Sequence, residues 1–310
     1  MKLPVVHHPA YAVPLPEGHR FPINKFAALA RFLGADGNSH LFAFHAPDEA
    51  TPAILERAHD PDYVRAILDR TLPADAVRRI GLPLTEDLVR RARLAAAGTV
   101  LTARLALGHG IATHVAGGSH HAHRDFGAGF CVFNDVAIAI EALRAEGLAE
   151  RVLVVDCDVH QGDGTAAIFA DEPRVFTLSL HGAANFPARK MRSDLDVALA
   201  DGTGDADYLA ALDGALAAAF AGFAPDFVFY NAGVDVHRDD RLGRLSLGDE
   251  GIRERDARVI RACRTRGLPL AVVSGGGYGD DVEAIARRHA IVHHLAAAAL
   301  SPNSAKGTGS

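Results

Sequence analysis

Residues 151–169 read RVLVVDCDVHQGDGTAAIF, and this stretch decides the fold. It begins with a short run of leucine and valine side chains, and then Asp156, Asp158, His160 and Asp163 follow within eight positions. A short apolar run rich in β-branched residues, bounded by a glycine-containing turn, indicates a buried strand. The segment therefore predicts a strand that delivers several polar side chains at its carboxyl end.

Similar short apolar runs occur on both sides of this stretch. Four further strand candidates, at residues 111–115, 175–180, 226–230 and 269–273, alternate with helical patterns at 135–147, 208–223, 246–266 and 280–295, after a helical region at 60–107. Strands that alternate with helices are typical of a parallel sheet covered on both faces. We predict an α/β fold: one domain over residues 1–300, a three-layer α/β/α sandwich with a mainly parallel sheet of about eight strands, followed by a disordered tail at 301–310.

Composition limits the classes of function. The chain has 310 residues, 49% of them hydrophobic, and a formal net charge of −6, which argues against disorder and against a nucleic-acid partner. No apolar run reaches the roughly 18 residues that a membrane span needs, so we expect no membrane span and a cytoplasmic location. The three cysteines are widely spaced, which favours buried, reduced thiols over disulfides or a cysteine zinc site.

Polar residues follow every one of the five strand candidates. They are GGSHH at 117–121, DCDVH at 156–160, SLH at 179–181, NAGVD at 231–235 and SGGGY at 274–278. In an open α/β sheet, ligands bind outside the carboxyl ends of the strands. The five segments are therefore expected to meet at one site.

Asp158 and His160 are candidate metal ligands. Side chains two positions apart share one side of an extended segment, so these two can chelate one ion, and Asp235 is available as a third ligand. Two carboxylates and one imidazole suit zinc with an open position for water, and Fe(II) fits the same set. An Asp and a His at a strand end can also cap the next helix, but the nearby carboxylates of Asp156 and Asp163 require some compensating cation.

The adjacent His120 and His121 can reach one pocket only from an irregular glycine-rich turn, which Gly117 and Gly118 provide. A carboxylate that accepts a hydrogen bond from one ring nitrogen fixes the tautomer and leaves the other nitrogen facing substrate. Tyr278, between glycines, can donate a hydrogen bond to an oxyanion. The glycine run at 274–279 lacks the lysine and spacing of a phosphate loop, so we exclude phosphate binding.

Five ordered motifs carry a family resemblance. The segments GGSHHAHRDFGAGFCVFNDVAIAI, VDCDVHQGDGTAAIF, LSLHG, NAGVDVHRDDRLG and SGGGYG resemble the zinc-dependent histone deacetylases of the arginase/deacetylase superfamily, over residues 60–279. Residues 78–99 and 181–190, together with Gln161, are most similar to the bacterial, class IV-like branch. The resemblance implies the arginase/deacetylase fold and hydrolysis of an acyl-lysine amide by an activated water molecule.

The resemblance also implies a role for each matched residue. The zinc ligands would be Asp158, His160 and Asp235. His121 would act as general base and then acid, with His120 as its electrostatic neighbour, Asp156 paired with His120, Asp163 paired with His121, and Tyr278 polarising the acyl carbonyl. A structural potassium ion would bind the side chains of Asp156 and Ser179 and the carbonyls of Asp156, Asp158, His160 and Leu180. The substrate tunnel would be lined by Gly129, Phe130, Phe186, Leu242, Gly276 and Gly277. Arg20 would lie in the entry or the acetate-release region.

Several alternatives stay open at this point. Residues 72–83 lack a clear match to the acidic residue with which class I members grip the substrate backbone, so the substrate is either an acyl-lysine protein or peptide, or an acetylpolyamine or another small acylated amine. A binding module without activity is less favoured because Tyr278 and every ligand are present. A binuclear ureohydrolase needs another Asp at position 162, which is Gly162. Acyl chain length and oligomeric state do not follow from the sequence.

Overall fold

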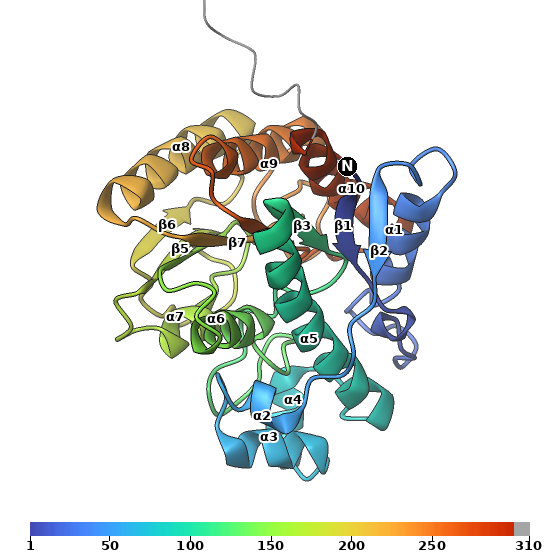
Figure 1. Cartoon of the computed structure of the whole chain (residues 1–310). Coiled ribbons are helices and arrows are strands. Elements are labelled where there is room, and N and C mark those ends of the chain that lie inside the picture. The colour runs from blue at the N-terminus through green and yellow to red at the C-terminus, as the bar shows by residue number, and fades with distance from the viewer. Residues whose placement is uncertain (301–310) are drawn as a thin grey trace, which may run out of the picture.

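One eight-stranded sheet organises the chain in the computed structural model, which describes residues 1–300 (Figure 1). The strand order is β2-β1-β3-β8-β7-β4-β5-β6, and every pairing is parallel. The strands are β1 Leu3–Val6, β2 Phe42–His45, β3 Ile111–His114, β4 Val152–Asp156, β5 Val175–Gly182, β6 Leu195–Leu199, β7 Phe227–Asn231 and β8 Leu270–Val273.

Helices cover both faces of this sheet. They are α1 Lys25–Gly34, α2 Pro52–Leu55, α3 Pro61–Leu68, α4 Ala74–Ile80, α5 Glu86–His109, α6 Asp135–Ala145, α7 Asp163–Ile168, α8 Asp205–Gly222, α9 Asp249–Arg264 and α10 Val282–Ala299, with the short 3-10 helix η1 Pro9–Tyr11. Helices α5 and α6 pack together on one face, while α8, α9, α10 and α1 form a row on the other (Figure 1). The predicted α/β sandwich with a parallel sheet is confirmed.

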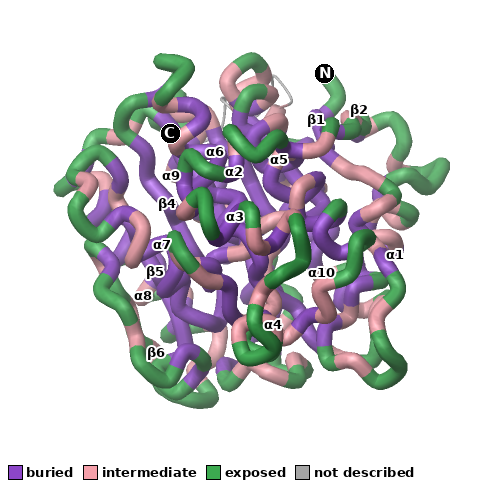
Figure 2. Tube along the Cα trace, turned by 90° about the horizontal axis from the view of Figure 1, so that it is seen from below, coloured by how far each residue is buried: buried purple, intermediate pink, exposed green. Residues whose placement is uncertain are grey.

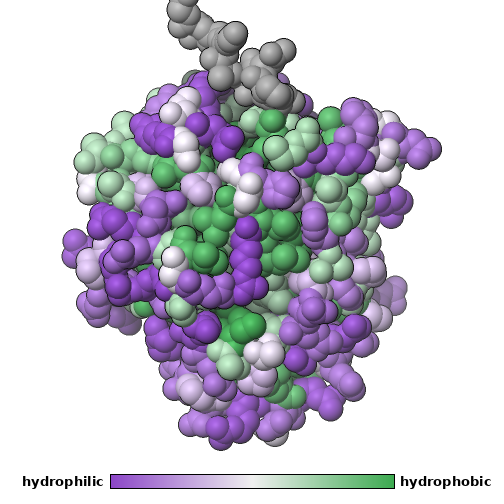
Figure 3. All heavy atoms as spheres, in the orientation of Figure 1, coloured by the Kyte–Doolittle hydropathy of each residue, from purple (hydrophilic) through white to green (hydrophobic). Residues whose placement is uncertain are grey.

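The core fills the spaces between these three layers. The sheet lies in the buried interior, and exposed backbone is concentrated in the outer loops and helix surfaces (Figure 2). The outside of the molecule is largely hydrophilic in the view of Figure 3, with hydrophobic side chains gathered toward the middle. Among residues 1–300, no helix combines the length and the apolar character needed to cross a bilayer.

The five predicted strands are present within one residue of their expected bounds, except that β5 extends two residues further, to Gly182. The helical region at 60–107 divides into α3, α4 and α5, because Pro73 precedes α4 and Gly81, at a φ of 76°, ends it. Strands β1, β2 and β6 were expected only in number, since their segments of four or five residues carry too little pattern. The tail predicted at 301–310 lies outside the described residues.

The topology places the polar segments together. The four central strands, β3, β8, β7 and β4, are neighbours, and their carboxyl ends lead into residues 115–121, 274–279, 232–235 and 157–163. Register brings Asp156 at the end of β4 opposite Asn231 of β7 and Ser179 of β5. The predicted convergence of the polar segments at one edge of the sheet is therefore what the backbone produces.

Candidate active site

The two adjacent histidines leave the sheet on a glycine turn. Gly117 and Gly118 have φ values of 82° and 85°, in the left-handed region that favours glycine. A Cβ on Gly118 would also lie 2.5 Å from the Asn231 side-chain oxygen. Both glycines are therefore needed for His120 and His121 to turn their rings toward the same space, where the ring centroids lie 4.1 Å apart.

Each histidine is held by its own carboxylate. Nδ1 of His120 lies 2.6 Å from Asp156 Oδ2, and Nδ1 of His121 lies 2.6 Å from Asp163 Oδ1. The two Nε2 atoms lie 3.2 Å apart. His123 adds a second contact to Asp163, at 3.1 Å. The sequence analysis expected these two Asp–His pairs, and the structure brings all four side chains together.

The surrounding charges shift the pKa values of His120 and His121 in opposite directions. Burial lowers the pKa of His120, but the charges of Asp156 and Asp158 outweigh burial and raise it to about 9. Burial and the neighbouring His120 charge lower the pKa of His121 to about 4, against the opposing effect of Asp163. The pair therefore holds its proton on His120 at neutral pH, and His121 keeps an unprotonated Nε2.

A buried carboxylate anchors the turn from below. Asp135, at the start of α6, accepts hydrogen bonds from the backbone N–H groups of Gly118 and Ser119 at 3.0 and 2.7 Å, and from the hydroxyl of Thr99 at 2.5 Å. Thr99 also contacts Nδ1 of His114 at 3.0 Å. Helices α5 and α6 thus fix the position of the histidine turn through hydrogen bonds that are closed to water.

Asp158, His160 and Asp235 form a cluster of possible metal ligands. One ligand atom from each lies within 4.8 Å of the others, and all three residues are buried. Nδ1 of His160 is 3.0 Å from Asp158 Oδ1 and 3.1 Å from Asp235 Oδ2, separations that suit ligands about 2.0 Å from one shared ion.

Backbone hydrogen bonds orient both carboxylates of this cluster. Val159 N–H donates to Asp235 Oδ1 at 2.9 Å, and Gly276 N–H donates to Asp158 Oδ2 at 2.7 Å. A Cβ on Gly276 would overlap the Asp235 carboxylate, so only glycine leaves this space free. These contacts hold the carboxylates toward His160 and keep room between them.

The electrostatics of the cluster favour a cation. Burial lowers the pKa of His160, but hydrogen bonds to Asp158 and Asp235 outweigh burial and raise it to about 10. Burial and the Asp158 charge raise the pKa of Asp235 to about 7. His160 and Asp235 bind protons more tightly than usual, because two buried carboxylates need positive charge between them. The donor set and its electrostatics therefore fit a divalent ion such as zinc.

Tyr278 reaches the same space from the loop after β8. Its ring lies edge-on to His160, with centroids 6.0 Å apart, and its backbone N–H donates to Asp240 at 2.6 Å. Burial and the charges of Asp158 and Asp235 raise the pKa of its phenol well above the ordinary value. The hydroxyl therefore stays protonated and is able to donate a hydrogen bond.

Lys25 supports this loop from the opposite side and is fully buried. Its ammonium donates to the carbonyls of Gly275 and Gly277 at 3.0 and 3.3 Å and lies 5.5 Å from the Tyr278 ring centroid. Burial lowers its pKa to about 8, opposed by the charges of Asp235 and Asp158. Lys25 thus fixes the glycine loop in place.

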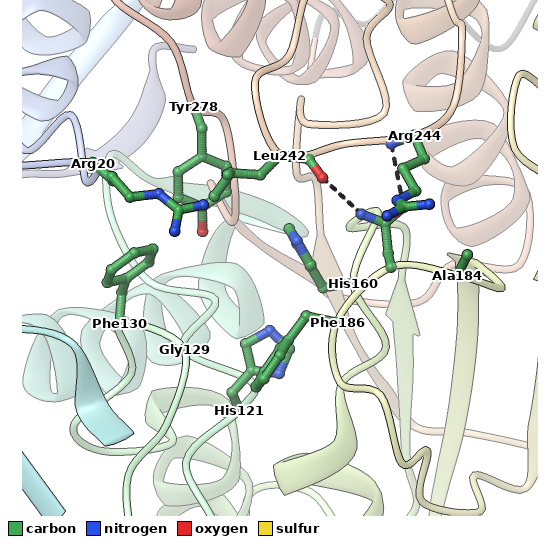
Figure 4. Close-up of a pocket in the computed structure, with 11 residues that line it drawn as sticks. Arg20, His121, Gly129, Phe130, His160, Ala184, Phe186, Leu242, Arg244 and Tyr278 are labelled. Atoms are coloured by element: carbon green, nitrogen blue, oxygen red, sulfur yellow. Dashed lines mark hydrogen bonds between the residues drawn. The ribbon is translucent and has the colours of Figure 1, made fainter. Parts of the chain in front are cut away.

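A pocket of about 310 Å³ connects these groups to solvent (Figure 4). His121, His160 and Tyr278 lie at its inner end, and the rest of its lining is Arg20, Gly129, Phe130, Ala184, Asn185, Phe186, Leu242 and Arg244. The Asn185 amide donates to the Leu242 carbonyl at 2.8 Å and joins two loops of the wall. The Phe186 ring meets the His121 ring edge-on, with centroids 4.8 Å apart.

Four of the six expected tunnel residues line this pocket. Gly129 and Phe130 both have positive φ, 54° and 66°, and a Cβ on Gly129 would lie 2.6 Å from the His121 ring. The other two are not among its lining residues, although Gly276 lines a smaller pocket that shares His121, Phe130 and Tyr278 with it. Gly276 contacts the metal-ligand carboxylates, and the open side of Gly277 faces Val234 and His289 in the interior.

The expected potassium residues lie on neighbouring strands. Asp156 pairs in register with Ser179, and Leu180 follows on β5. The Ser179 hydroxyl contacts Nδ1 of His181 at 3.0 Å, and the Asp156 carboxylate accepts from Asn231 at 3.0 Å as well as from His120. These side chains already have hydrogen-bond partners in the protein.

Several positioning residues were missing from the sequence analysis. Asn231 and Asp135 lie inside quoted motifs, but no role was assigned to either, and Lys25 was not considered. Gln161 served only to indicate the class IV-like branch. Its side chain holds the Phe186 loop through Met191, accepting from the backbone N–H at 2.9 Å and donating to the carbonyl at 2.6 Å. For Asn231 and Gln161, an amide side chain beside a strand end is the only signal that the sequence offers, whereas Lys25 and Asp135 stand at helix starts with no such signal.

Comparisons with known proteins identify the family. A model described as the histone deacetylase domain matches residues 19–295. An uncharacterized protein of Picosynechococcus sp. is 47% identical, over 96% of this chain and 99% of its own length. Histone deacetylase 2 of Arabidopsis thaliana is 31% identical, over 87% of this chain and 74% of its own. A probable deacetylase of Methanothermobacter thermautotrophicus is 30% identical, over 91% of this chain and 87% of its own length.

Solved structures agree with these matches. The HD domain of HDA15 superposes with a TM-score of 0.80 at 25% identity, over 96% of this chain and 89% of its own. An HDAC homologue complexed with SAHA superposes with a TM-score of 0.79 at 25% identity, over 96% of this chain and 84% of its own. Sequence, fold and site geometry lead to one assignment: the chain belongs to the histone deacetylase family.

Proposed function

We propose that this protein is a zinc-dependent deacylase that removes acetyl or longer acyl groups from lysine side chains. One observation carries the proposal: a single pocket ends at the His121 imidazole, the Tyr278 phenol and His160, a member of the three-residue ligand cluster. A base, a hydrogen-bond donor and a Lewis-acid site in one pocket are what hydrolysis of an unactivated amide requires.

His121 would handle the proton in both halves of the reaction. Its neutral Nε2 takes a proton from a water molecule in the pocket as that water attacks the acyl carbonyl carbon. The resulting imidazolium is stabilised by Asp163 at 2.6 Å, and it then delivers the proton to the departing amine. The C–N bond breaks, and the products are a carboxylic acid and a free amine. His120 and Asp156 keep a positive charge beside the developing negative charge.

Tyr278 would stabilise that negative charge on the carbonyl oxygen. Its phenol stays protonated in the folded protein, so it can donate a hydrogen bond throughout the reaction. The backbone bond to Asp240 and the Lys25 contacts hold the Tyr278 loop at the inner end of the pocket. Asp240 and Lys25 are therefore positioning residues in this proposal.

Asp158, His160 and Asp235 would hold the zinc ion. When bound, zinc supplies a Lewis acid that polarises the carbonyl and makes water more acidic. Fe(II) could use the same ligands. One structural potassium ion near Asp156 and Ser179 stays a proposal that follows from family membership. Placement in the class IV-like branch and a cytoplasmic location also stay proposals.

The pocket walls suit an acyl-lysine. Phe130 and Phe186 line the passage above the catalytic groups, where flat aromatic faces can enclose an alkyl stem. Small acylated amines fit the same chemistry and remain the alternative substrates.

The test uses the full chain loaded with one equivalent of zinc. Lysine peptides carrying acetyl and longer acyl groups, together with an acetylpolyamine, are assayed for amine release, with a hydroxamate as inhibitor control. We expect amide hydrolysis that the hydroxamate blocks. Absence of hydrolysis on every substrate, in protein that binds zinc and the hydroxamate, would contradict the proposal and indicate a binding protein.

A further inference from the structure

The mouth of the pocket is positively charged, in a chain whose formal net charge is −6. None of the residues that line the pocket is an aspartate or glutamate, whereas Arg20 and Arg244 lie at opposite sides of its opening (Figure 4). The excess of positive charge is therefore local, and it lies where the amine side of a bound substrate would emerge.

The two arginines differ in how their charge is balanced. Arg244 lies 3.1 Å from Asp201 in an exposed ion pair, and its backbone N–H donates to Asn185. Arg20 is exposed and forms no ion pair with any residue in the range 1–300. Its guanidinium extends across the opening between Phe130 and Tyr278 (Figure 4). Arg20 is thus a free cation aimed at the substrate path.

The loop that carries Phe186 adds to this charge. Residues 183–193 contain Arg189, Lys190 and Arg192 and no acidic residue. Lys190 folds back and donates to the carbonyls of Asn185 and Pro187, both at 2.6 Å, so its charge stays beside the pocket wall. No ion pair within the described part of the chain neutralises the three cations.

Asp240, two positions before Leu242 of the pocket wall, is turned inward. Asp240 accepts from the backbone N–H groups of Tyr278, Leu242 and Gly243 at 2.6, 2.8 and 2.9 Å, so its oxygens are used inside the loop. A cationic amine at the opening would therefore meet arginine without a carboxylate partner. A carboxylate at the same place would meet up to two guanidinium groups, which recognise it well.

We infer that the mouth selects acylated amines that carry a carboxylate on the amine side, and that Arg20 reads this group. The inference rests on the proposed function and names its substrate class. The carboxylate can come from an acidic residue next to the acyl-lysine in a peptide or from the α-carboxylate of free acyl-lysine. Acetylpolyamines and acyl-lysines within strongly basic segments are the disfavoured substrates.

The test compares three peptides of equal length, each with a central acetyl-lysine flanked by Glu, Gln or Lys on both sides. Free Nε-acetyl-lysine and its α-amide form a second matched pair, which separates the two sources of carboxylate. For each compound kcat/KM is measured with the zinc-loaded full chain, and the Kd of the labelled peptides is measured by fluorescence anisotropy. The Gln peptide tests the proposed function, and the Glu-to-Lys ratio tests the inference.

The variants are Arg20→Gln, Arg20→Glu and Arg261→Glu. Arg261 is an exposed arginine near the end of α9, at the opposite edge of the sheet. Arg261→Glu changes the net charge by the same amount as Arg20→Glu. We expect the wild type to favour the Glu peptide over the Lys peptide on the order of tenfold at low salt, and less at high salt. Arg20→Gln should reduce this ratio, Arg20→Glu should reverse it, and Arg261→Glu should leave it unchanged.

Equal kcat/KM and equal Kd for the Glu and Lys peptides in the wild type would overturn the inference. A shift in Arg261→Glu as large as that in Arg20→Glu would do the same, because the effect would then come from net charge. If none of these peptides is hydrolysed and the longer-acyl peptides are not hydrolysed either, the proposed function fails, and the order of the Kd values still decides the inference.

Discussion

Two buried charged clusters lie beneath the carboxyl ends of β4 and β7, and they differ in how their charge is balanced. In the first, four carboxylates surround three imidazoles and open into the pocket. In the second, Arg255 and Asp256 form an ion pair at 2.8 Å, with side chains that are 0% and 1% exposed. The hydroxyl of Tyr230 donates to Asp256 at 2.5 Å, and this cluster lines none of the described pockets.

The balanced cluster supports the unbalanced one. Arg255 donates to the carbonyls of Gly233 and Cys157, at 2.5 and 3.3 Å, in the segments that carry Asp235 and Asp158. A buried ion pair with all of its hydrogen bonds made can serve structure alone. Four buried carboxylates whose only ion-pair partners are imidazoles require a further cation, and that requirement marks the functional site.

The largest effect is expected where the unbalanced cluster handles the proton. Replacing the general base in His121→Asn should reduce kcat/KM by about 10²- to 10⁴-fold, with zinc affinity and thermal stability near those of the wild type. Steady-state kinetics on an acetyl-lysine peptide provide the measurement. Because Asp163 acts through His121, Asp163→Asn should add little in the His121→Asn background. Full additivity of the two losses would give Asp163 a separate role.

The balanced cluster should respond in stability. Arg255→Met leaves Asp256 buried without its partner, so we expect the free energy of unfolding to fall by about 3–5 kcal/mol. Urea unfolding followed by circular dichroism provides the measurement. The double variant Arg255→Met, Asp256→Asn removes both charges and should recover part of the loss. A single variant as stable as the wild type would show that Arg255 does not hold the two segments.

A smaller loss of activity is expected at Tyr278. Tyr278→Phe removes one donor to the oxyanion and should lower kcat by about 10²- to 10³-fold, with little change in substrate Kd. Tyr208→Phe is the matched control, because Tyr208 is also buried and its hydroxyl lacks a hydrogen-bond partner within residues 1–300. An unchanged rate in Tyr278→Phe would remove this residue from the mechanism.

The smallest effect concerns a buried histidine outside both clusters. His59 accepts a hydrogen bond from the Asn134 N–H at 2.8 Å, and burial lowers its pKa to about 4. The unfolded chain, with an ordinary pKa of about 6.5, takes up this proton first as pH falls. Above pH 6.5 the lowered pKa of His59 therefore does not affect the free energy of unfolding. Between pH 6.5 and about 4 it lowers this free energy progressively.

We expect this single group to lower the free energy of unfolding by about 1.4 kcal/mol between pH 7.5 and 5.5. His59→Gln can still accept from Asn134 but does not titrate, so its stability should fall less over this range. Urea unfolding at the two pH values compares the slopes, and other buried histidines contribute equally to both proteins. Identical pH slopes would mean that His59 is protonated in the folded state.

Much of the architecture follows from local patterns. The apolar runs that become β3, β4, β5, β7 and β8 end in polar residues, and parallel strands place such ends at one edge of the sheet. The grouping of His120, His121 and the three ligand residues was therefore predictable. The metal-ligand role was inferred from the residue types and spacing, and the catalytic roles came from the family resemblance. All of these roles stay proposals.

Contacts between segments far apart in the chain could not be predicted from the sequence. Lys25 reaches Gly275 and Gly277 across about 250 positions, and nothing in its own neighbourhood marks it as buried. Arg255 and Asp135 look like ordinary charged helix residues until their helices pack on the sheet. The placement of Gly277 away from the tunnel depends on the path of one loop, which composition does not determine.

The central claim is that Asp158, His160 and Asp235 hold one divalent ion on which amide hydrolysis depends. The most direct measurement is elemental analysis of the purified chain combined with turnover of an acetyl-lysine peptide before chelation, after chelation and after adding zinc back. The account predicts one ion per chain, loss of turnover with the ion, recovery with zinc, and a lower ion content in Asp235→Asn. Undiminished turnover in metal-free protein would contradict it.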